Sequence, residues 1–166
     1  IPPLFPGISV DEVNTAYTDA VATATDAYDG NVAVITTGTV DTSLIGSYTL
    51  SYNAVDNAGN NANTITKTVN VVDTTKPVIT LNGLTNIDHQ VNTAYTDAKA
   101  TVTDNYDNTF QVETNDTVNT AVLGTYTLTY NASDANGNVA DSVSRTVNVV
   151  DTVSPVITII GDNPAT

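Results

Sequence analysis

The sequence contains no cysteine, methionine or tryptophan, and it has one histidine among 166 residues. Without cysteine the chain has no disulfide bond, no thiolate metal ligand and no thiol nucleophile. Basic residues are also scarce, since 4 Lys and Arg stand against 18 Asp and Glu, which gives a formal net charge of −14. Proteins that bind nucleic acid or anionic lipid need clustered basic side chains. The composition therefore argues against both partners, and no apolar run approaches the roughly 20 residues that cross a bilayer.

What the sequence does contain is a long internal repeat. The segment NTAYTDAVATATDAYDGN from Asn14 returns as NTAYTDAKATVTDNYDNT from Asn92, and 92 − 14 gives a period of 78 residues. A unit of 78 residues is too long for a solenoid repeat and has the size of a small domain. We therefore predict a first repeat over residues 1–75, a second repeat over residues 76–153, and over residues 154–166 the first strand of a further repeat or a donor strand.

Within each copy, apolar residues alternate with polar ones, which is the pattern of a half-buried β-strand. In the segment 48–54, for example, Leu50, Tyr52 and Ala54 alternate with Thr, Ser and Asn. Thr and Val are abundant, and no segment shows the apolar spacing of a helix. The sequence therefore predicts an all-β chain of two antiparallel sandwiches. In the second repeat we expect strands at residues 78–81, 98–103, 110–114, 118–122, 125–133 and 142–150.

One motif points to the type of sandwich. Gly46-Ser-Tyr48 and Gly124-Thr-Tyr126 put a tyrosine at the start of the penultimate strand, which resembles the tyrosine corner of immunoglobulin-like domains. The wider pattern G-x-Y-T-L-x-Y-N-A-x-D-x-x-G-N, followed by V-N-V-V-D-T, resembles the tandem bacterial immunoglobulin-like repeats of surface proteins and adhesins, and is similar to HYR and cadherin-like repeats. The resemblance implies two tandem immunoglobulin-like β-sandwiches joined by a short linker. It also implies an extracellular, cell-surface, structural or adhesive module that is not an enzyme.

The acidic residues gather at predicted strand ends. In an immunoglobulin-like sandwich, the loops that carry Asp104, Asp107 and Asp134 emerge at the end where the first strand enters, beside the linker that follows Asp73. Ca²⁺ takes six to eight oxygen ligands in flexible geometry, which suits Asp and Asn loops. We therefore expect a calcium ion there that stiffens the two-repeat rod, as the cadherin resemblance also implies. Its expected ligands are Asp73, Asp104, Asp107, Asp134, Asn136 and Asn138, and equivalent partial sites are expected at Asp26, Asp29, Asp56, Asn57 and Asn60, and at Asp151.

A simpler interpretation of these residues stays open. Asp, Asn and Gly are the usual turn formers because their side chains bond the nearby backbone or tolerate a left-handed conformation. The same loops are therefore compatible with turn chemistry alone. His89 is expected to be an exposed residue of the loop 86–92, and Lys67 is expected to cover the sandwich edge with its aliphatic stem.

Two alternative functions also follow from the sequence. Ile1-Pro2-Pro3 stands where the first repeat needs its first strand, and proline cannot donate to a ladder, whereas residues 155–161 read as a good first strand. That layout predicts a surface filament or surface-layer subunit that polymerises by donor-strand exchange, unless the tail simply opens a further repeat. The expected partners are neighbouring repeats or identical subunits, and a cell-surface glycan or protein. A carbohydrate-binding accessory module would use the aromatic faces of Tyr17, Tyr28, Tyr95 and Tyr106.

Overall fold

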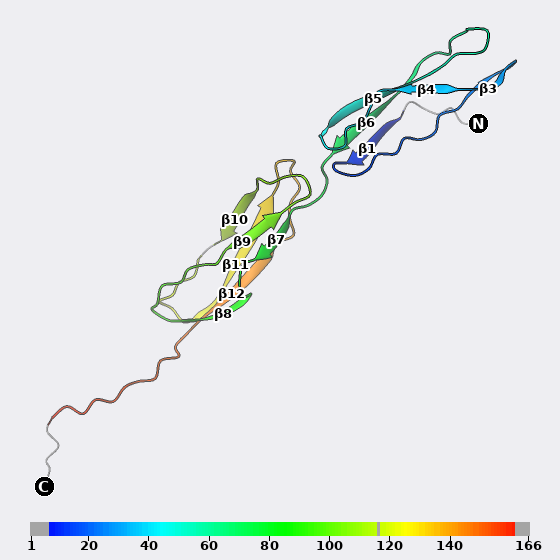
Figure 1. The fold of residues 1–166 in the computed structure, drawn as a ribbon. Helices are drawn as coiled ribbons and strands as arrows, with labels where there is room; N and C mark the ends of the chain where they lie inside the picture. The colour runs from blue at the N-terminus through cyan, green and yellow to red at the C-terminus, as the bar shows by residue number, and fades with distance from the viewer. Residues whose placement is uncertain (1–6, 116, 162–166) are drawn as a thin grey trace. The chain divides into compact units, whose positions relative to one another are not determined.

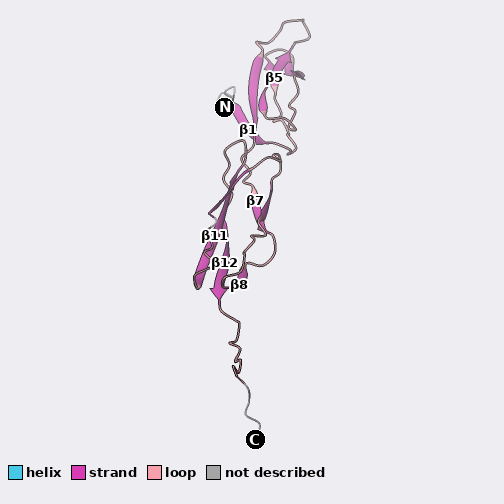
Figure 2. Cartoon of the chain, turned by 90° about the vertical axis from the view of Figure 1, so that its left-hand side faces the viewer, coloured by secondary structure: helices cyan, strands magenta, loops and turns pink. Residues whose placement is uncertain are grey.

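Strands and loops make up the whole described structure. The computed structural model describes residues 7–115 and 117–161. Within these ranges every regular element is a β-strand, as Figure 2 shows, and the all-β prediction is confirmed. In the same part of the chain, no helix suited to spanning a membrane is found.

Twelve strands lie in the described residues, six in each sequence repeat (Figure 1). The first repeat contains β1 (Ile8–Glu12), β2 (Ala24–Asp26), β3 (Gly30–Val32), β4 (Val34–Thr37), β5 (Gly46–Ala54) and β6 (Ile65–Val72). The second contains β7 (Val78–Leu81), β8 (Asn86–Gln90), β9 (Ala100–Thr103), β10 (Gln111–Asn115), β11 (Gly124–Ser133) and β12 (Val143–Val150).

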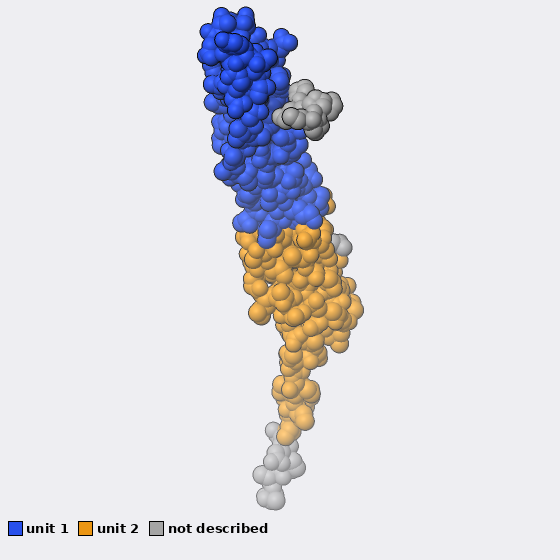
Figure 3. Space-filling model, turned by 90° about the vertical axis from the view of Figure 1, so that its right-hand side faces the viewer, with its two compact units in different colours: residues 1–78, 103–111, 133–140 blue, residues 79–102, 112–132, 141–166 orange. Residues whose placement is uncertain are grey.

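The chain divides into two compact units, coloured blue and orange in Figure 3. The first unit comprises residues 1–78, 103–111 and 133–140, and the second comprises residues 79–102, 112–132 and 141–166. The first unit therefore includes two loops that belong to the second repeat in sequence. These loops carry the candidate ligands Asp104, Asp107, Asp134, Asn136 and Asn138.

The main sheet has the same order in both repeats. It runs β1-β6-β5-β4 in the first and β8-β12-β11-β10 in the second. The central pairs β5/β6 and β11/β12 are antiparallel, with Gly46 opposite Val71 and Gly124 opposite Val149. The outer strands β1 and β8 run parallel to β6 and β12. Two further strands form a separate pair in each repeat, β2 with β3 and β7 with β9.

Burial follows the two-residue period of the strands. In β12, Arg145, Val147 and Val149 are buried, and the residues between them are more exposed. β11 shows the same alternation, with Leu128 and Tyr130 fully buried. Because successive side chains point to opposite faces of a sheet, one face of each main sheet forms a core and the other meets solvent.

The tyrosine corner predicted from the sequence is present in both repeats. Tyr48 Oη donates to the Leu44 carbonyl at 2.9 Å, and Tyr126 Oη donates to the Val122 carbonyl at 3.0 Å. The segment 118–122, predicted as a strand, is instead the turn that presents this carbonyl. Asn119 Oδ1 accepts a hydrogen bond from the Ala121 amide at 3.1 Å, and this side-chain bond turns the backbone away from an extended path.

Other departures from the predicted strands have local causes. The strand predicted at 98–103 begins only at Ala100, because Lys99 has a left-handed φ of 65° that interrupts the extended backbone. His89, predicted to lie in an exposed loop, is a half-buried residue of strand β8. β8 is joined to β12 by backbone pairing, which leaves little trace in the side-chain pattern.

The two ends of the chain are described to different extents. Residues 155–161 have a strand-like sequence, but here they form no strand and are exposed. The prolines that were expected to exclude a first strand lie in residues 1–6, outside the described residues, as do residues 162–166 of the predicted third segment.

Candidate metal centre

Three acidic side chains converge in the first compact unit. Asp73 follows β6, Asp104 follows β9 and Asp134 follows β11, and each offers one carboxylate oxygen within 4.8 Å of the other two. Asp73 and Asp134 are buried, with 7% and 6% of their surfaces exposed. The immunoglobulin-like topology predicted this convergence of residues separated by up to 61 positions (134 − 73).

Asp134 is held by the turn that follows it. Its Oδ1 accepts hydrogen bonds from the Asn136 and Asn138 amides at 2.9 and 2.8 Å, and Asn138 Nδ2 donates to its Oδ2 at 2.8 Å. Burial alone would raise the pKa of Asp134, but these hydrogen bonds lower it below its ordinary value. The carboxylate is therefore kept ionised by its own loop.

Asp73 lies in a less favourable environment. Burial is the main cause that raises its pKa above the ordinary value, and the negative charges of Asp104 and Asp134 act in the same direction. Hydrogen bonds from the Thr75 amide at 3.2 Å and from Asn136 Nδ2 at 2.9 Å oppose this shift without cancelling it. The ionised form of Asp73 is thus destabilised by its surroundings.

Asp104 supplies an unsatisfied oxygen to the same place. Its Oδ1 accepts hydrogen bonds from the Tyr106 and Asp107 amides at 2.9 and 3.1 Å. Its Oδ2 is buried and has no hydrogen-bond partner. Buried polar atoms are nearly always paired, so a carboxylate oxygen without a hydrogen-bond partner beside two other carboxylates is a donor arrangement that suits a cation.

The remaining predicted ligands serve as supports. Asn136 Nδ2 bridges Asp73 Oδ2 and Asp107 Oδ2, at 2.9 Å from each, and Asn138 Nδ2 also donates to the Asp73 carbonyl at 3.2 Å. Asp107 does not belong to the three-acid group, because its Oδ2 instead accepts from Asn136 and from the Ala135 amide at 3.2 Å. Turn chemistry and acid clustering therefore occur in the same loops.

The predicted partial site of the first repeat is built from similar turns. Asp26 Oδ1 accepts from the Tyr28 and Asp29 amides at 2.7 and 3.0 Å, and Asp56 Oδ1 accepts from the Asn60 amide at 2.7 Å. Asn57 Nδ2 donates to Asp29 Oδ1 at 2.9 Å. Within residues 7–115 and 117–161, these acids form no group of three with ligand spacing.

Asp151 occupies the position in the second repeat that Asp73 occupies in the first, but its hydrogen-bond partners are different. Its Oδ1 accepts hydrogen bonds from Gln90 Nε2 at 3.3 Å and from the Val153 amide at 3.1 Å. It belongs to no acidic group in the part of the chain that is described. Asp151 is therefore a natural control for Asp73.

Glu12 is a neighbouring residue that the sequence reasoning missed. Its carboxylate accepts hydrogen bonds from the amide and hydroxyl groups of both Thr74 and Thr75, at 2.6 to 3.2 Å. Asn105 Nδ2 lies 3.4 Å from the Glu12 Oε1 atom. Glu12 thus clamps the segment that follows Asp73. The repeat alignment carried only a weak signal for Glu12, because Gln90 stands at the equivalent position. In the structure, Gln90 Oε1 accepts hydrogen bonds from Thr152 in the same way.

The Glu12 clamp predicts a specific acid sensitivity. Burial would raise the pKa of Glu12, but the hydrogen bonds from Thr74, Thr75 and Asn105 lower it from 4.5 to about 2. Its stabilising contribution is therefore present above pH 4.5 and is lost as the pH falls toward about 2. We expect Glu12→Gln to remove up to about 1 kcal/mol of this acid dependence, because the site is partly solvated. Urea unfolding of the wild type and of Glu12→Gln between pH 2 and pH 6 measures this difference. Identical pH dependence of the free energy of unfolding in the two proteins would contradict the prediction.

Each repeat also contains an ion pair that the sequence reasoning did not identify. Arg145 Nη1 bonds Asp97 Oδ1, and both side chains are buried, with 0% and 1% exposed. Arg145 Nε donates to the Leu84 carbonyl at 2.9 Å, and Tyr130 Oη donates to Asp97 at 2.7 Å. The equivalent pair in the first repeat is more open, with Lys67 Nζ 2.9 Å from Asp19 and 22% and 26% of the side chains exposed.

The comparisons with known proteins agree with this architecture. Among the curated proteins, none matches the chain. The family described as "Bacterial surface protein, Ig-like domain" matches at residues 9–71 and again at residues 79–149. These two matches cover most of the sequence and coincide with the two sets of strands. The chain therefore belongs to the bacterial surface proteins with immunoglobulin-like domains, and it carries two such domains in tandem.

Proposed function

We propose that this chain is a structural module of a bacterial cell-surface protein, and that Ca²⁺ bound by Asp73, Asp104 and Asp134 stabilises it. The family supplies the surface role in its general form. The observation that carries the calcium proposal is the orphan Oδ2 of Asp104 beside two buried carboxylates. A divalent cation would offset two of the three negative charges and would also give this oxygen a partner.

The chemistry of the donor set favours calcium over other ions. All three acidic ligands are hard oxygen donors, and the chain has no cysteine that would favour zinc. The loops are irregular, and Ca²⁺ accepts irregular geometry more readily than Mg²⁺, which requires a near-ideal octahedron. Asn136 and Asn138 would complete the shell by turning their amide oxygens toward the ion, in place of the N–H groups that now face the carboxylates.

The proposed ion would join three segments that are far apart in sequence. Asp73 belongs to the link between the repeats, whereas Asp104 and Asp134 belong to two loops of the second repeat. Binding would therefore restrict the link relative to these loops, which is a useful property for a spacer or adhesive stalk. Carbohydrate binding by Tyr17, Tyr28, Tyr95 and Tyr106 stays a prediction from the sequence.

A calcium titration of the full chain tests the proposal. At a free Ca²⁺ concentration of 100 times Kd, we expect about 2.7 kcal/mol of added stability. That stabilisation corresponds to a rise of about 10–20 °C in the melting temperature of a domain of about 80 residues. Calorimetry should also show binding, with Mg²⁺ much weaker than Ca²⁺.

Variants separate this site from general charge screening. Asp104→Asn should abolish the calcium-dependent rise in Tm, because it removes the unpartnered carboxylate oxygen. Asp151→Asn removes the same charge at a residue outside the three-acid group and should leave the rise intact. A melting temperature that does not respond to millimolar Ca²⁺, or an equal response in both variants, would reject calcium binding at this site.

A further inference from the structure

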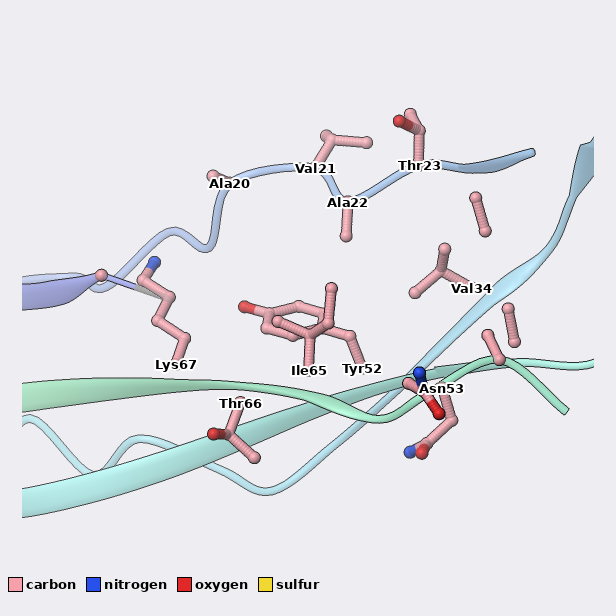
Figure 4. A pocket seen from close by; sticks show the side chains of 15 residues that line it. Ala20, Val21, Ala22, Thr23, Val34, Tyr52, Asn53, Ile65, Thr66 and Lys67 are labelled. Atoms are coloured by element: carbon pink, nitrogen blue, oxygen red, sulfur yellow. The ribbon is translucent and has the colours of Figure 1, made fainter. Parts of the chain in front are cut away.

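Asparagine is followed by glycine at two places in the sequence, Asn82-Gly83 and Asn136-Gly137. In such a pair the glycine nitrogen can attack the side-chain carbonyl carbon of the asparagine, because glycine has no side chain that hinders the approach and its backbone turns freely. Other asparagines lack this neighbour. Asn53, which is labelled in Figure 4, is followed by Ala54, and both residues are paired with β4. The two Asn-Gly pairs are therefore the positions that favour a spontaneous modification of asparagine.

The structure immobilises the first pair. Asn82 is half-buried, its backbone amide donates to the Lys99 carbonyl at 3.0 Å, and its side chain donates to the Ala98 carbonyl at 3.2 Å. Its own carbonyl accepts a hydrogen bond from the buried guanidinium of Arg145. The attack requires rotation of the peptide group that follows Asn82, and this rotation would break the bond to Arg145. We therefore expect Asn82 to react only when this part of the second repeat opens.

The second pair lies in the exposed turn that follows β11. Asn136 and Gly137 are both exposed, Gly137 has a φ of 92°, and no atom lies within 4 Å of the position that a side chain would take there. The Asn136 side chain is held by two hydrogen bonds, from its Nδ2 to Asp73 and Asp107. Water can replace such bonds at an exposed residue, and loops of this kind open at a small cost in free energy. Asn136 can therefore reach the reactive geometry in the folded chain.

We propose that Asn136 is a site of spontaneous deamidation. The Gly137 nitrogen bonds to the side-chain carbonyl carbon of Asn136, and the bond from that carbon to Nδ2 breaks. Nδ2 leaves as ammonia, with the proton that the Gly137 nitrogen gives up. Water then opens the succinimide ring at either of its carbonyls, which yields aspartate or isoaspartate at this position. Water is the co-reactant, and the reaction needs no calcium.

The location of Asn136 gives this modification a consequence. Its Nδ2 lies 2.9 Å from Asp73 Oδ2 and 2.9 Å from Asp107 Oδ2. Deamidation removes both N–H donors and puts a carboxylate in their place, so attraction is replaced by repulsion between like charges. Without calcium, the product should be less stable than the unmodified chain. A consequence for calcium rests on the proposed function: the new carboxylate adds a charged ligand, so binding should tighten.

Incubation of the folded chain in EDTA, at neutral pH and physiological temperature, tests the proposal. Peptide mapping by mass spectrometry reads the change of amide to acid at both Asn-Gly pairs in the same sample, so Asn82 is the internal control. In the folded chain Asn136 should react at least about tenfold faster than Asn82, and in urea the two rates should converge. Equal rates in the folded chain, or an Asn136 that reacts only in urea, would overturn the proposal.

Two variants of Asn136 test the consequence for stability. Asn136→Asp reproduces one product, and Asn136→Ala loses the same two hydrogen bonds without adding a charge. In EDTA the melting temperature should fall in the order wild type, Asn136→Ala, Asn136→Asp, with at least about 4 °C between the two variants. Equal melting temperatures of the two variants would overturn the claim that the new charge is repelled by its neighbours.

A calcium titration keeps this inference separate from the proposed function. Asn136→Asp should bind Ca²⁺ at least about threefold more tightly than the wild type. Absence of Ca²⁺ binding in both chains would reject the proposed function, whereas the deamidation rates in EDTA would still decide the modification. Binding in the wild type that is no tighter in Asn136→Asp would overturn the consequence for calcium.

Discussion

Replacing Arg145 with methionine should lower the free energy of unfolding of the second repeat by about 3–5 kcal/mol, because Asp97 is then left as an uncompensated buried charge. Arg145 is completely buried, and its guanidinium also bonds the Leu84 carbonyl at 2.9 Å. A loss of this size approaches the total stability of a small domain. Urea unfolding monitored by tyrosine fluorescence measures it.

The first repeat contains the control for this experiment. Lys67 and Asp19 form the equivalent pair at 2.9 Å, but both side chains are about a quarter exposed. When Lys67 is replaced, water still solvates the partly exposed carboxylate of Asp19. Lys67→Met should therefore lower the free energy of unfolding by only about 1 kcal/mol. Equal losses for the two variants would contradict the view that burial decides the strength of each pair.

Two further variants keep the Arg145 prediction testable if Arg145→Met does not fold. Arg145→Lys retains the positive charge but loses the planar fork that bonds several acceptors, so we expect an intermediate loss. Asp97→Asn combined with Arg145→Met removes both charges and should recover part of the stability lost in the single variant. No recovery in the double variant would mean that lost packing, and not the unpaired charge, dominates.

Without calcium, the Asp73→Asn variant should be more stable than the wild type. In excess calcium, it should be less stable than the wild type. Two like charges whose oxygens lie within 4.8 Å of each other repel by at least about 3 kcal/mol at an effective dielectric constant of about 20. We expect a net gain of about 1–3 kcal/mol without calcium, since Asn keeps the size of Asp and one acceptor oxygen. Thermal melting in EDTA and in calcium measures both effects.

The sign of the pH dependence gives an independent check. Burial and the charges of Asp104 and Asp134 raise the pKa of Asp73, so the folded chain binds this proton more readily than the unfolded chain. Without calcium, the free energy of unfolding of the wild type therefore rises as the pH falls through the raised pKa of Asp73. The Asp73→Asn variant lacks this pH dependence. Asp151→Asn is the control because Asp151 belongs to no acidic group among the described residues. A loss of stability in Asp73→Asn without calcium would contradict the prediction.

The sequence alone determined the domain type and much of the candidate site. The 78-residue repeat and the two-residue alternation of β5 and β11 are local patterns, so they predict strands without knowledge of the fold. The motif around Tyr48 and Tyr126 predicted the tyrosine corners that both repeats contain. With that topology, Asp73, Asp104 and Asp134 could be expected to meet.

Other features were decided only by the tertiary structure. β1 and β8 were missed because their parallel pairing with β6 and β12 uses backbone groups that every residue has. The partners Asp97 and Arg145 are 48 positions apart in sequence, and no local pattern joins them. The similar sequences around Tyr52 and Tyr130 gave no sign that Tyr52 is half-buried whereas Tyr130 is buried.

The contrast between Asp73 and Asp151 summarises the physical reason. Both residues directly follow equivalent strands, β6 and β12, in the same sequence, V-N-V-V-D-T, yet one belongs to a three-acid cluster and the other does not. A residue's own sequence fixes its local conformation, but burial and charge depend on which segments surround it. For Asp73, those segments are the loops that carry Asp104 and Asp134, and only the folded chain brings them together.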